Sequence, residues 1–569
     1  MLFTFTRRLS LNFALLAILF LFAAAPRLAA QGGEPGYFAI RGATVVPVSG
    51  PRIENATVVI SKGVITAVGA NVKIPDEAWV IDGKGLTIYP GLFDSFTDVG
   101  IPAEPSAAPA PGGGGGGRQQ APQAQQAISR GPEDRPASTP WRTAADEVSL
   151  SDKRIESWRD AGFTTVISAP KGGMFPGQAA VLDLAGERPG DLVVKTPVAI
   201  PVSLQAAGGF GNFPGSLMGA LAYVRQVWLD TEWSTKADAI YDKNPRGIAR
   251  PRYDRTEAAL ADALEDHALV LIPANNSVQI LRALDLASRW HVNGVLYGGQ
   301  MSYDVAPEIA AKKLPVLVDL KWPEAEKDTD PDAVPTLRAL RFRDRAPSSP
   351  AALAKAGVKF AFYSGAITAP KDILKAAKKS IDAGLAPDAA LRALTLSPAE
   401  IFGVSDRLGS IETGKIANLV VTDGDLFNER TKIKFVFVDG QRFPIHEPEK
   451  PKDPPKGDLT GKWKLAYTGE NGPEESTADL AMATDGTLTG TVTGARGTTN
   501  ITRGYLSADK FSFTITVPVQ GSPADVTFAG TFDGTSLKGS LSVGSYSGDF
   551  TGTKPNITTS ALTVSGGAQ

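Results

Sequence analysis

Cysteine is absent from the 569-residue chain, and only three histidines occur in it. Without cysteine the chain has no disulfides, thiolate metal sites, iron–sulfur clusters, thiol nucleophile or bacterial lipoprotein anchor. His267, His291 and His446 are all the imidazoles available for metal binding or acid–base chemistry. This scarcity restricts the chemistry of the protein more than any other feature of its composition.

Excess charge of one sign is also missing. The chain carries 58 Lys and Arg against 60 Asp and Glu, a formal net charge of -2. Such a balance produces no field strong enough to gather phosphate backbones or anionic lipid. We therefore expect no nucleic-acid partner. At roughly 150 residues per domain, the length allows two to four domains, each with its own core.

Long apolar runs are rare, and the clearest one lies at the start of the chain. Arg7 and Arg8 precede an apolar segment, residues 13–25, that ends in small residues. This pattern is typical of an export signal, and the apolar core is shorter than the roughly 20 residues that span a membrane. We predict a signal peptide at residues 1–30, cleaved after Ala25 or Ala30, and a periplasmic or secreted protein without a membrane anchor.

Composition shifts divide the remainder of the chain. Residues 37–89 read as short strands and turns, including a tight turn at residues 61–63. Residues 101–140 are rich in Pro, Ala, Gly and Gln, with six glycines at 112–117, and we expect a disordered insertion. A charged, Pro-rich linker follows at 448–456. Residues 457–555 alternate Thr, Ser and Val with Gly turns, which predicts an antiparallel β domain of roughly eight strands.

Strand-like and helix-like segments alternate between residues 90 and 403. Apolar runs typical of buried strands occur at 163–167, 196–200, 268–272, 294–297, 315–318 and 358–363. Amphipathic stretches lie among them, at 255–266, 278–290, 305–312 and 371–383. This alternation favours parallel strands joined by helices, and its length suits a (β/α)8 TIM barrel. Strand patterns return within 404–447, so we predict an α/β fold: a barrel with a composite β-sandwich from both flanks (37–89 and 404–447), plus a C-terminal all-β domain.

Three stretches carry a family resemblance. Residues 85–94 resemble the entry into the first barrel strand of the amidohydrolase superfamily. Residues 408–421, followed by 436–440, are similar to the segment that closes the β-sandwich of that superfamily, and residues 386–400 fit its helix pair. The resemblance spans about residues 37–445. It is strongest to the exported imidazolonepropionase-like and dipeptidase-like branch, through residues 213–222 and 280–284.

The resemblance implies a divalent metal such as zinc at the mouth of the barrel, where it activates water and polarises a carbonyl. The family's ligands are a His-x-His pair after the first strand, one His after each of strands five and six, and an Asp after strand eight. In this chain the matched positions are substituted: Phe96, Asp98, Pro273, Gln300 and Gly365. Only Asp98 and Gln300 retain an oxygen donor. The resemblance thus implies no bound cofactor and a vestigial site without catalytic residues.

The three histidines do not replace these ligands. His267 and His291 precede strands five and six, and therefore belong to the face of the barrel opposite the catalytic one. His446 lies beside the linker, and we expect structural or solvated roles for all three. Lys171 lies in a Gly-rich loop after strand two. It could act as a carboxylated-lysine ligand only if the barrel strands are numbered differently from the assignment above. That loop is expected to be a turn.

Several functions remain open. In the first, the chain is a non-catalytic pseudoenzyme that binds a small amide or peptide ligand, or assembles as a homo- or hetero-oligomer with an active relative. In the second, it hydrolyses carbon–nitrogen bonds with an unusual carboxylate-based metal site built from Asp94, Asp98, Asp319 or Gln300. In the third, the C-terminal β domain binds a surface polymer and the barrel is a scaffold. The missing histidines favour the first.

Overall fold

The computed structural model divides into two compact units, Met1–Ile445 and His446–Gln569, and each is described by itself. The predicted signal, residues 1–30, and His446 fall outside the described residues. So do most of the predicted insertion and part of the predicted linker. The residues that the structure describes are 36–102, 135–205, 214–325, 334–445, 453–469, 472–494, 497–519, 522–543 and 546–554.

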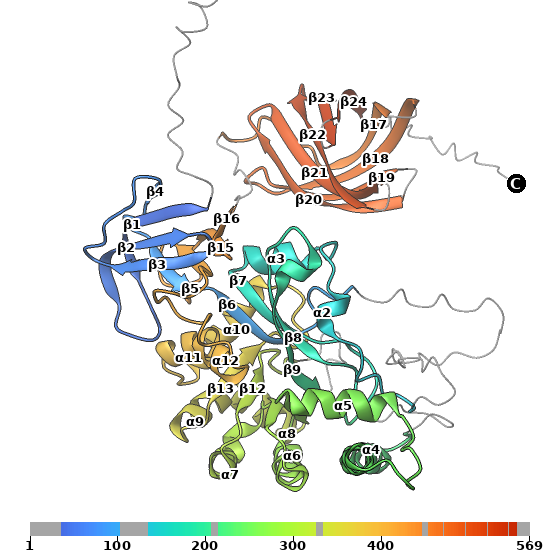
Figure 1. The fold of residues 1–569 in the computed structure, drawn as a ribbon. Helices are drawn as coiled ribbons and strands as arrows, with labels where there is room; N and C mark the ends of the chain where they lie inside the picture. Colours follow the sequence, from blue (N-terminus) through green and yellow to red (C-terminus); the bar gives the residue numbers. More distant parts are fainter. Residues whose placement is uncertain are drawn as a thin grey trace, which may run out of the picture. The chain divides into compact units, whose positions relative to one another are not determined.

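An eight-stranded barrel forms the body of the first unit (Figure 1). The two end strands of its sheet, β6 and β13, also lie side by side, so the sheet is nearly closed. The predicted TIM-like barrel is therefore confirmed. In order around the sheet, its strands are β6 (Leu92–Thr97), β7 (Phe163–Ser168), β8 (Ala179–Asp183), β9 (Val193–Pro201), β10 (Leu269–Ala274), β11 (Gly294–Gly298), β12 (Val316–Asp319) and β13 (Phe360–Tyr363).

One barrel strand departs from the expected parallel order. β8 runs antiparallel to both β7 and β9, whereas β9 to β13 are parallel to one another. Residues 169–178 join β7 to β8 without a helix. Only an antiparallel neighbour can be reached by so short a connection, because a parallel strand requires a crossover of a dozen or more residues.

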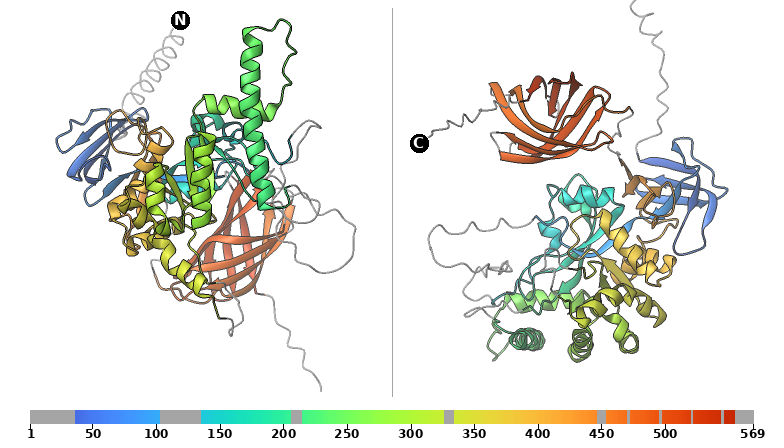
Figure 2. Two further views of the ribbon diagram at one scale, coloured as in Figure 1. Left: turned by 90° about the horizontal axis from the view of Figure 1, so that it is seen from below. Right: turned by 180° about the vertical axis from the view of Figure 1, so that it is seen from behind.

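Helices cover the outside of the barrel (Figures 1 and 2). Four of them, α5, α6, α7 and α10, coincide with the predicted amphipathic stretches. The described helices are α2 (Ala144–Glu147), α3 (Arg154–Asp160), α4 (Leu217–Lys243), α5 (Arg255–Glu265), α6 (Ser277–Trp290), α7 (Ala306–Lys312), α8 (Leu337–Arg345), α9 (Ser349–Lys355), α10 (Lys371–Asp382), α11 (Pro387–Ala393) and α12 (Leu396–Ile401). No helix in these residues is both long and apolar enough to cross a membrane.

A second sheet of the first unit combines strands from both flanks of the barrel. β14 pairs with β5, and β5 in turn pairs with β1, so segments more than 300 residues apart in sequence share one sheet. Its strands are β1 (Tyr37–Val45), β2 (Ile53–Ser61), β3 (Val64–Gly69), β4 (Trp79–Asp82), β5 (Thr87–Pro90), β14 (Leu419–Thr422), β15 (Ile433–Val438) and β16 (Gln441–Pro444). Lys62 and Gly63 both have positive φ in the predicted turn between β2 and β3.

This composite sheet folds over its own core. The rings of Phe38 on β1 and Phe437 on β15 meet at a centroid distance of 5.3 Å, although their strands are not neighbours in the sheet. An isolated bridge between Val64 and Ile416 draws the far edge toward the chain just before β14. The two halves of the sheet thus enclose apolar side chains as the layers of a sandwich do.

The end of the predicted insertion is folded rather than free. Residues 103–134 lie outside the described residues, but Ser138 and Thr139 are buried and Arg135 forms ion pairs with acids of α4 and α5. Thr139 also donates its backbone N–H to the carbonyl of Phe175. The composition of residues 135–140 resembles that of the glycine-rich segment before them, so the predicted disordered insertion included them. Contacts to elements distant in sequence leave no trace in local composition.

The second unit is a closed antiparallel barrel (Figure 1). Each strand pairs with the next, and the last pairs with the first. Its own apolar core includes the fully buried Trp463. The strands are β17 (Gly461–Gly469), β18 (Gly472–Met482), β19 (Leu488–Gly494), β20 (Gly497–Ser507), β21 (Lys510–Val519), β22 (Ser522–Phe532), β23 (Ser536–Val543) and β24 (Tyr546–Thr553).

Candidate functional site

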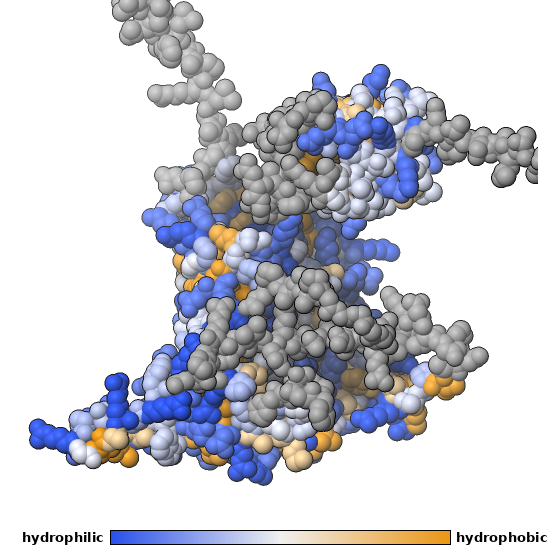
Figure 3. Space-filling view, turned by 90° about the vertical axis from the view of Figure 1, so that its right-hand side faces the viewer, coloured by the Kyte–Doolittle hydropathy of each residue, from blue (hydrophilic) through white to orange (hydrophobic). Residues whose placement is uncertain are grey.

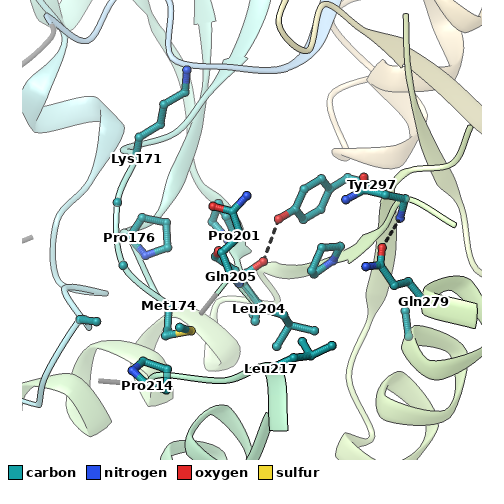
Figure 4. A pocket seen from close by; sticks show the side chains of 18 of the residues that line it. Lys171, Met174, Pro176, Pro201, Leu204, Gln205, Pro214, Leu217, Gln279 and Tyr297 are labelled. Carbon is teal, nitrogen blue, oxygen red and sulfur yellow. Dashed lines mark hydrogen bonds between the residues drawn. The ribbon is translucent and has the colours of Figure 1, made fainter. Parts of the chain in front are cut away.

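A cavity of about 550 Å³ opens beside the carboxyl ends of the barrel strands (Figure 4). Phe96 and Pro273 line it, together with Tyr297 and apolar side chains from the loops after β7 and β9. No Asp or Glu occurs among its described lining residues, which include two cations, Lys171 and Arg282. The cavity therefore suits a ligand with an apolar body and a negatively charged group.

Aromatic rings occupy the mouth of the barrel next to this cavity. The ring of Phe96, on β6, lies 5.0 Å from the ring of Tyr297 and 5.9 Å from that of Tyr363, measured between centroids. The hydroxyl of Tyr297 donates to the carbonyl of Val202 at 3.0 Å, so the ring is held across the cavity wall. Burial raises the pKa of Tyr297, and this phenol therefore remains neutral.

Asp98 lies between two cations. Its Oδ1 accepts from Arg154 Nη1 and its Oδ2 pairs with Lys171 Nζ, each at 2.9 Å. Arg154 also donates to the backbone carbonyls of Asp98 and Ile101. The carboxylate and Lys171 thus fasten the loop after β6 to the loop after β7.

Gln300 contributes hydrogen bonds to the neighbouring loop. Its Nε2 donates to the carbonyls of Asp319 at 3.1 Å and Lys321 at 2.7 Å. The backbone carbonyl of Gln300 accepts from the hydroxyl of Ser349 at 2.8 Å. The side chain therefore supports the segment that follows β12, and neither Gln300 nor Asp98 is among the residues that line the cavity.

Gly365 follows β13 in a left-handed conformation, with φ at 58°. A Cβ built on it would overlap the carboxylate of Asp319. Asp319 therefore occupies the space that a side chain at position 365 would need. This explains why only glycine is compatible with the observed arrangement.

Asp94, which is buried, and Asp319, which is half-buried, form an acidic pair. Asp94 accepts from Trp158 Nε1 at 3.0 Å and from the backbone N–H of Ser364 at 2.9 Å. Burial raises the pKa of Asp94. Burial also raises the pKa of Asp319 to about 6, with a smaller contribution from the charge of Asp94, while the hydroxyl of Tyr363 donates to Asp319.

The five positions that the sequence singles out are thus only partly gathered. Phe96 and Pro273 both line the cavity. Asp98 and Gln300 instead form hydrogen bonds that hold loops together, and Gly365 leaves space for the carboxylate of Asp319. His267 and His291 are exposed at the ends of α5 and α6. In the described part of the chain, no three side chains of His, Asp or Glu are grouped as metal ligands would be.

Arg282 is a site residue that the sequence does not reveal. It lies one turn into α6, the helix that starts at the carboxyl end of β10, and it is half-buried in the cavity wall. No described residue forms a hydrogen bond or ion pair with it. Its position in an amphipathic helix gave no sign of this, because arginine on such a helix is usually solvated.

Comparison with known proteins agrees with the fold. Residues 333–443 match the family model described as "Amidohydrolase family". The structure of an amidohydrolase from Thermotoga maritima MSB8 is similar, with 24% identity, a TM-score of 0.57, and coverage of 72% of this chain and 100% of that chain. A prolidase complexed with N-methylphosphonate-L-proline gives 18% identity and a TM-score of 0.43, with coverage of 72% and 100%. A putative prolidase from Bifidobacterium longum gives 16% identity and a TM-score of 0.43, with coverage of 72% of this chain and 94% of that chain.

None of the curated proteins matches the chain in sequence. The match to the family model lies in the last part of the barrel and the strands that complete the composite sheet. The Thermotoga amidohydrolase shares the fold over its full length. The chain thus matches the amidohydrolase family in sequence over residues 333–443, and its first unit shares the fold of an amidohydrolase.

Proposed function

We propose that the protein binds a small carboxylate ligand, such as an N-acyl amino acid or a short peptide, at the mouth of its barrel without hydrolysing it. The observation that carries this proposal is the chemistry of the cavity wall, which offers aromatic rings and cations but, among its described residues, no carboxylate. A hydrolase of this superfamily needs an activated water beside the scissile carbonyl.

The residues at the mouth do not fit the divalent metal that the family uses. Phe96, Pro273 and Gly365 have no side-chain donor atom. Both oxygens of Asp98 already pair with cations, and the Gln300 amide donates to two carbonyls. A structural zinc site gains roughly 10 to 16 kcal/mol from four good ligands, so one amide oxygen leaves only millimolar affinity at best.

The acidic pair is a poor replacement for these ligands. Asp94 and Asp319 each accept backbone hydrogen bonds, which occupy lone pairs that a metal would need. Burial also raises the pKa of both groups, so protons compete with a metal for these oxygens more strongly than at an exposed carboxylate. This argues against the alternative of an active hydrolase with a carboxylate-based metal site.

Arg282 is the proposed anchor of the ligand carboxylate. Lys171 is already paired with Asp98, whereas Arg282 has no partner in the described residues. Guanidinium groups bind carboxylates through two parallel hydrogen bonds. The apolar part of the ligand would then pack against Phe96, Pro273 and Tyr297.

Calorimetry with N-acetyl-L-phenylalanine and with its neutral amide tests the proposal. We expect the acid to bind at least about tenfold more tightly than the amide, since a charge-assisted hydrogen bond contributes about 1.5 kcal/mol or more. Arg282→Gln should remove this preference. The matched control is Arg289→Gln on the same helix, where the arginine is exposed and pairs with Asp285.

Hydrolysis is followed in the same samples by chromatography, and bound metal by elemental analysis. We expect no product above a buffer control and no stoichiometric transition metal. One or more equivalents of zinc, manganese or iron, together with turnover, would overturn the non-catalytic assignment. Equal binding of the acid and the amide would instead refute the carboxylate anchor.

A further inference from the structure

Gln279 is a cavity residue whose side chain is held in one orientation. It lies in the first turn of α6, and its Oε1 accepts from the backbone N–H of Asn275 at 3.0 Å (Figure 4). Its own backbone N–H donates to the side chain of Asn276 at 3.0 Å. Because the oxygen is used, the amide nitrogen is the free end of the side chain, and it forms no hydrogen bond with the described residues. The cavity wall thus offers a neutral N–H donor.

Gln279 and Arg282 lie one turn apart on the same face of α6. Both line the cavity, and so does Ala283, which shows that this face of the helix is turned toward it. Residues three apart on a helix have Cβ atoms roughly 5 to 6 Å from each other. A neutral donor and a cation therefore lie side by side at the cavity wall.

We infer that Gln279 selects the ligand by an acyl group on its α-nitrogen. The inference rests on the proposed function, because Arg282 has to hold the ligand carboxylate first. In an N-acyl amino acid, only the α-carbon and the amide nitrogen separate the carboxylate from the acyl carbonyl. A ligand held by Arg282 can thus place its acyl oxygen at the Gln279 amide and accept a hydrogen bond there. The ligand class narrows from small carboxylates in general to α-amino acids with an acylated nitrogen.

A free α-amino group does not fit the same position. At neutral pH it is an ammonium group, which has donors but no acceptor. It would face the Gln279 donor and the Arg282 cation, and none of the described lining residues is a carboxylate that could neutralise it. The cost of removing it from water would then have no compensating bond. Free amino acids should therefore bind more weakly than acids that lack the nitrogen altogether.

The remainder of the cavity wall suits the apolar body of such a ligand. Met174, Leu204 and Leu217 line it together with several prolines. On the face of the molecule in Figure 3, by contrast, blue and pale side chains cover most of the coloured surface, and the orange ones lie in separate groups. A phenyl group therefore leaves water more completely inside the cavity than on the coloured part of that face.

Calorimetry with ligands that share one apolar body tests the inference. They are N-acetyl-L-phenylalanine, L-phenylalanine and 3-phenylpropanoate, which lacks the nitrogen. We expect the wild type to bind the acetylated acid about fivefold more tightly than 3-phenylpropanoate, as one neutral hydrogen bond allows, and L-phenylalanine more weakly than both. Gln279→Met removes the amide but keeps a side chain of similar length. It should abolish the fivefold preference and leave the affinity for 3-phenylpropanoate unchanged, which also shows that the cavity is intact.

The matched control is Gln226→Met on α4, where the amide donates to Asp230 and lies outside the cavity lining. It should leave every affinity unchanged. Equal binding of N-acetyl-L-phenylalanine and 3-phenylpropanoate by the wild type, or a preference that survives Gln279→Met, would overturn the role of Gln279 and leave the carboxylate anchor standing. Arg282→Gln without effect on the binding of 3-phenylpropanoate would instead refute the proposed function itself.

Discussion

A single buried carboxyl group joins the barrel to the composite sheet. Asp183, at the end of β8, accepts from the hydroxyl of Thr165 at 2.7 Å and from Asn418 Nδ2 at 3.0 Å. Asn418 also accepts from the backbone N–H of Asp439 at 2.7 Å. The segment that resembles the closing segment of the superfamily therefore stabilises the first unit, because its asparagine bonds two sheets at once.

This carboxyl group should make the stability of the first unit depend on pH. Burial raises the pKa of Asp183 from 3.8 to about 7, so the folded state holds a proton that the unfolded state releases. The resulting stability is fully present below about pH 4 and is lost as the pH rises through about 7. It amounts to about 4 kcal/mol at most. Asp94 and Asp319 act in the same direction.

Asp183→Asn should therefore flatten this dependence. Thermal unfolding measured from pH 4 to pH 8 should show a smaller fall in midpoint for the variant than for the wild type. The exposed Asp372→Asn is the control and should leave the slope unchanged. A wild-type stability that rises over this range would show that Asp183 is ionised in the folded protein.

At the scale of elements, one arginine holds two helices to the chain that precedes the barrel's second strand. Arg135 pairs with Asp230 of α4 at 2.7 Å, with Asp254 at the start of α5 at 2.9 Å, and with Glu257. These side chains are only 11% to 30% exposed. Three acids around one partly buried cation make the arginine essential to their arrangement.

Arg135→Ala should loosen α4 and α5 without unfolding the barrel. Removing the cation leaves three carboxylates close together, and we expect a loss of about 3 kcal/mol in the stability of this region. Hydrogen exchange should accelerate in residues 217–265 and remain unchanged in β10 to β13. The exposed pair of Arg188 and Asp191 provides the control, Arg188→Ala. Unchanged exchange in α4 would mean that apolar packing alone holds the helix.

On the scale of the whole molecule, the two units have separate cores. Trp463 is fully buried in the second unit, where its Nε1 donates to the carbonyl of Leu459 at 2.8 Å and its ring meets Phe532 at 5.8 Å. Phe163, on β7, is equally buried in the first unit.

Each core should therefore melt on its own. Trp463→Ala should destabilise the second unit by about 3 to 5 kcal/mol, and Phe163→Ala should destabilise the first unit by a similar amount. Differential scanning calorimetry should show two transitions, with each variant lowering a different one. A single transition that both variants lower would establish that the two units unfold together.

Much of the fold could be predicted from the sequence. The alternation of apolar runs and amphipathic stretches predicted six barrel strands and four helices, because buried parallel strands and one-sided helices each leave a distinct periodicity. α4 was missed, since it carries apolar residues on its buried face and also on its exposed face. β8 was missed as well, because its few apolar residues gave no signal beside the longer runs.

The sequence by itself determined which donor atoms the mouth of the barrel can offer, because residue identity sets side-chain chemistry: phenyl, proline and glycine groups have no lone pair to share. Only the tertiary structure decided what the remaining groups do. The pairing of Asp98 with two cations, the overlap that keeps position 365 a glycine, and Arg282 in the cavity wall without a partner among the described residues depend on loops from different strands meeting at one edge. Distances between residues far apart in sequence are set by packing, which local patterns do not contain.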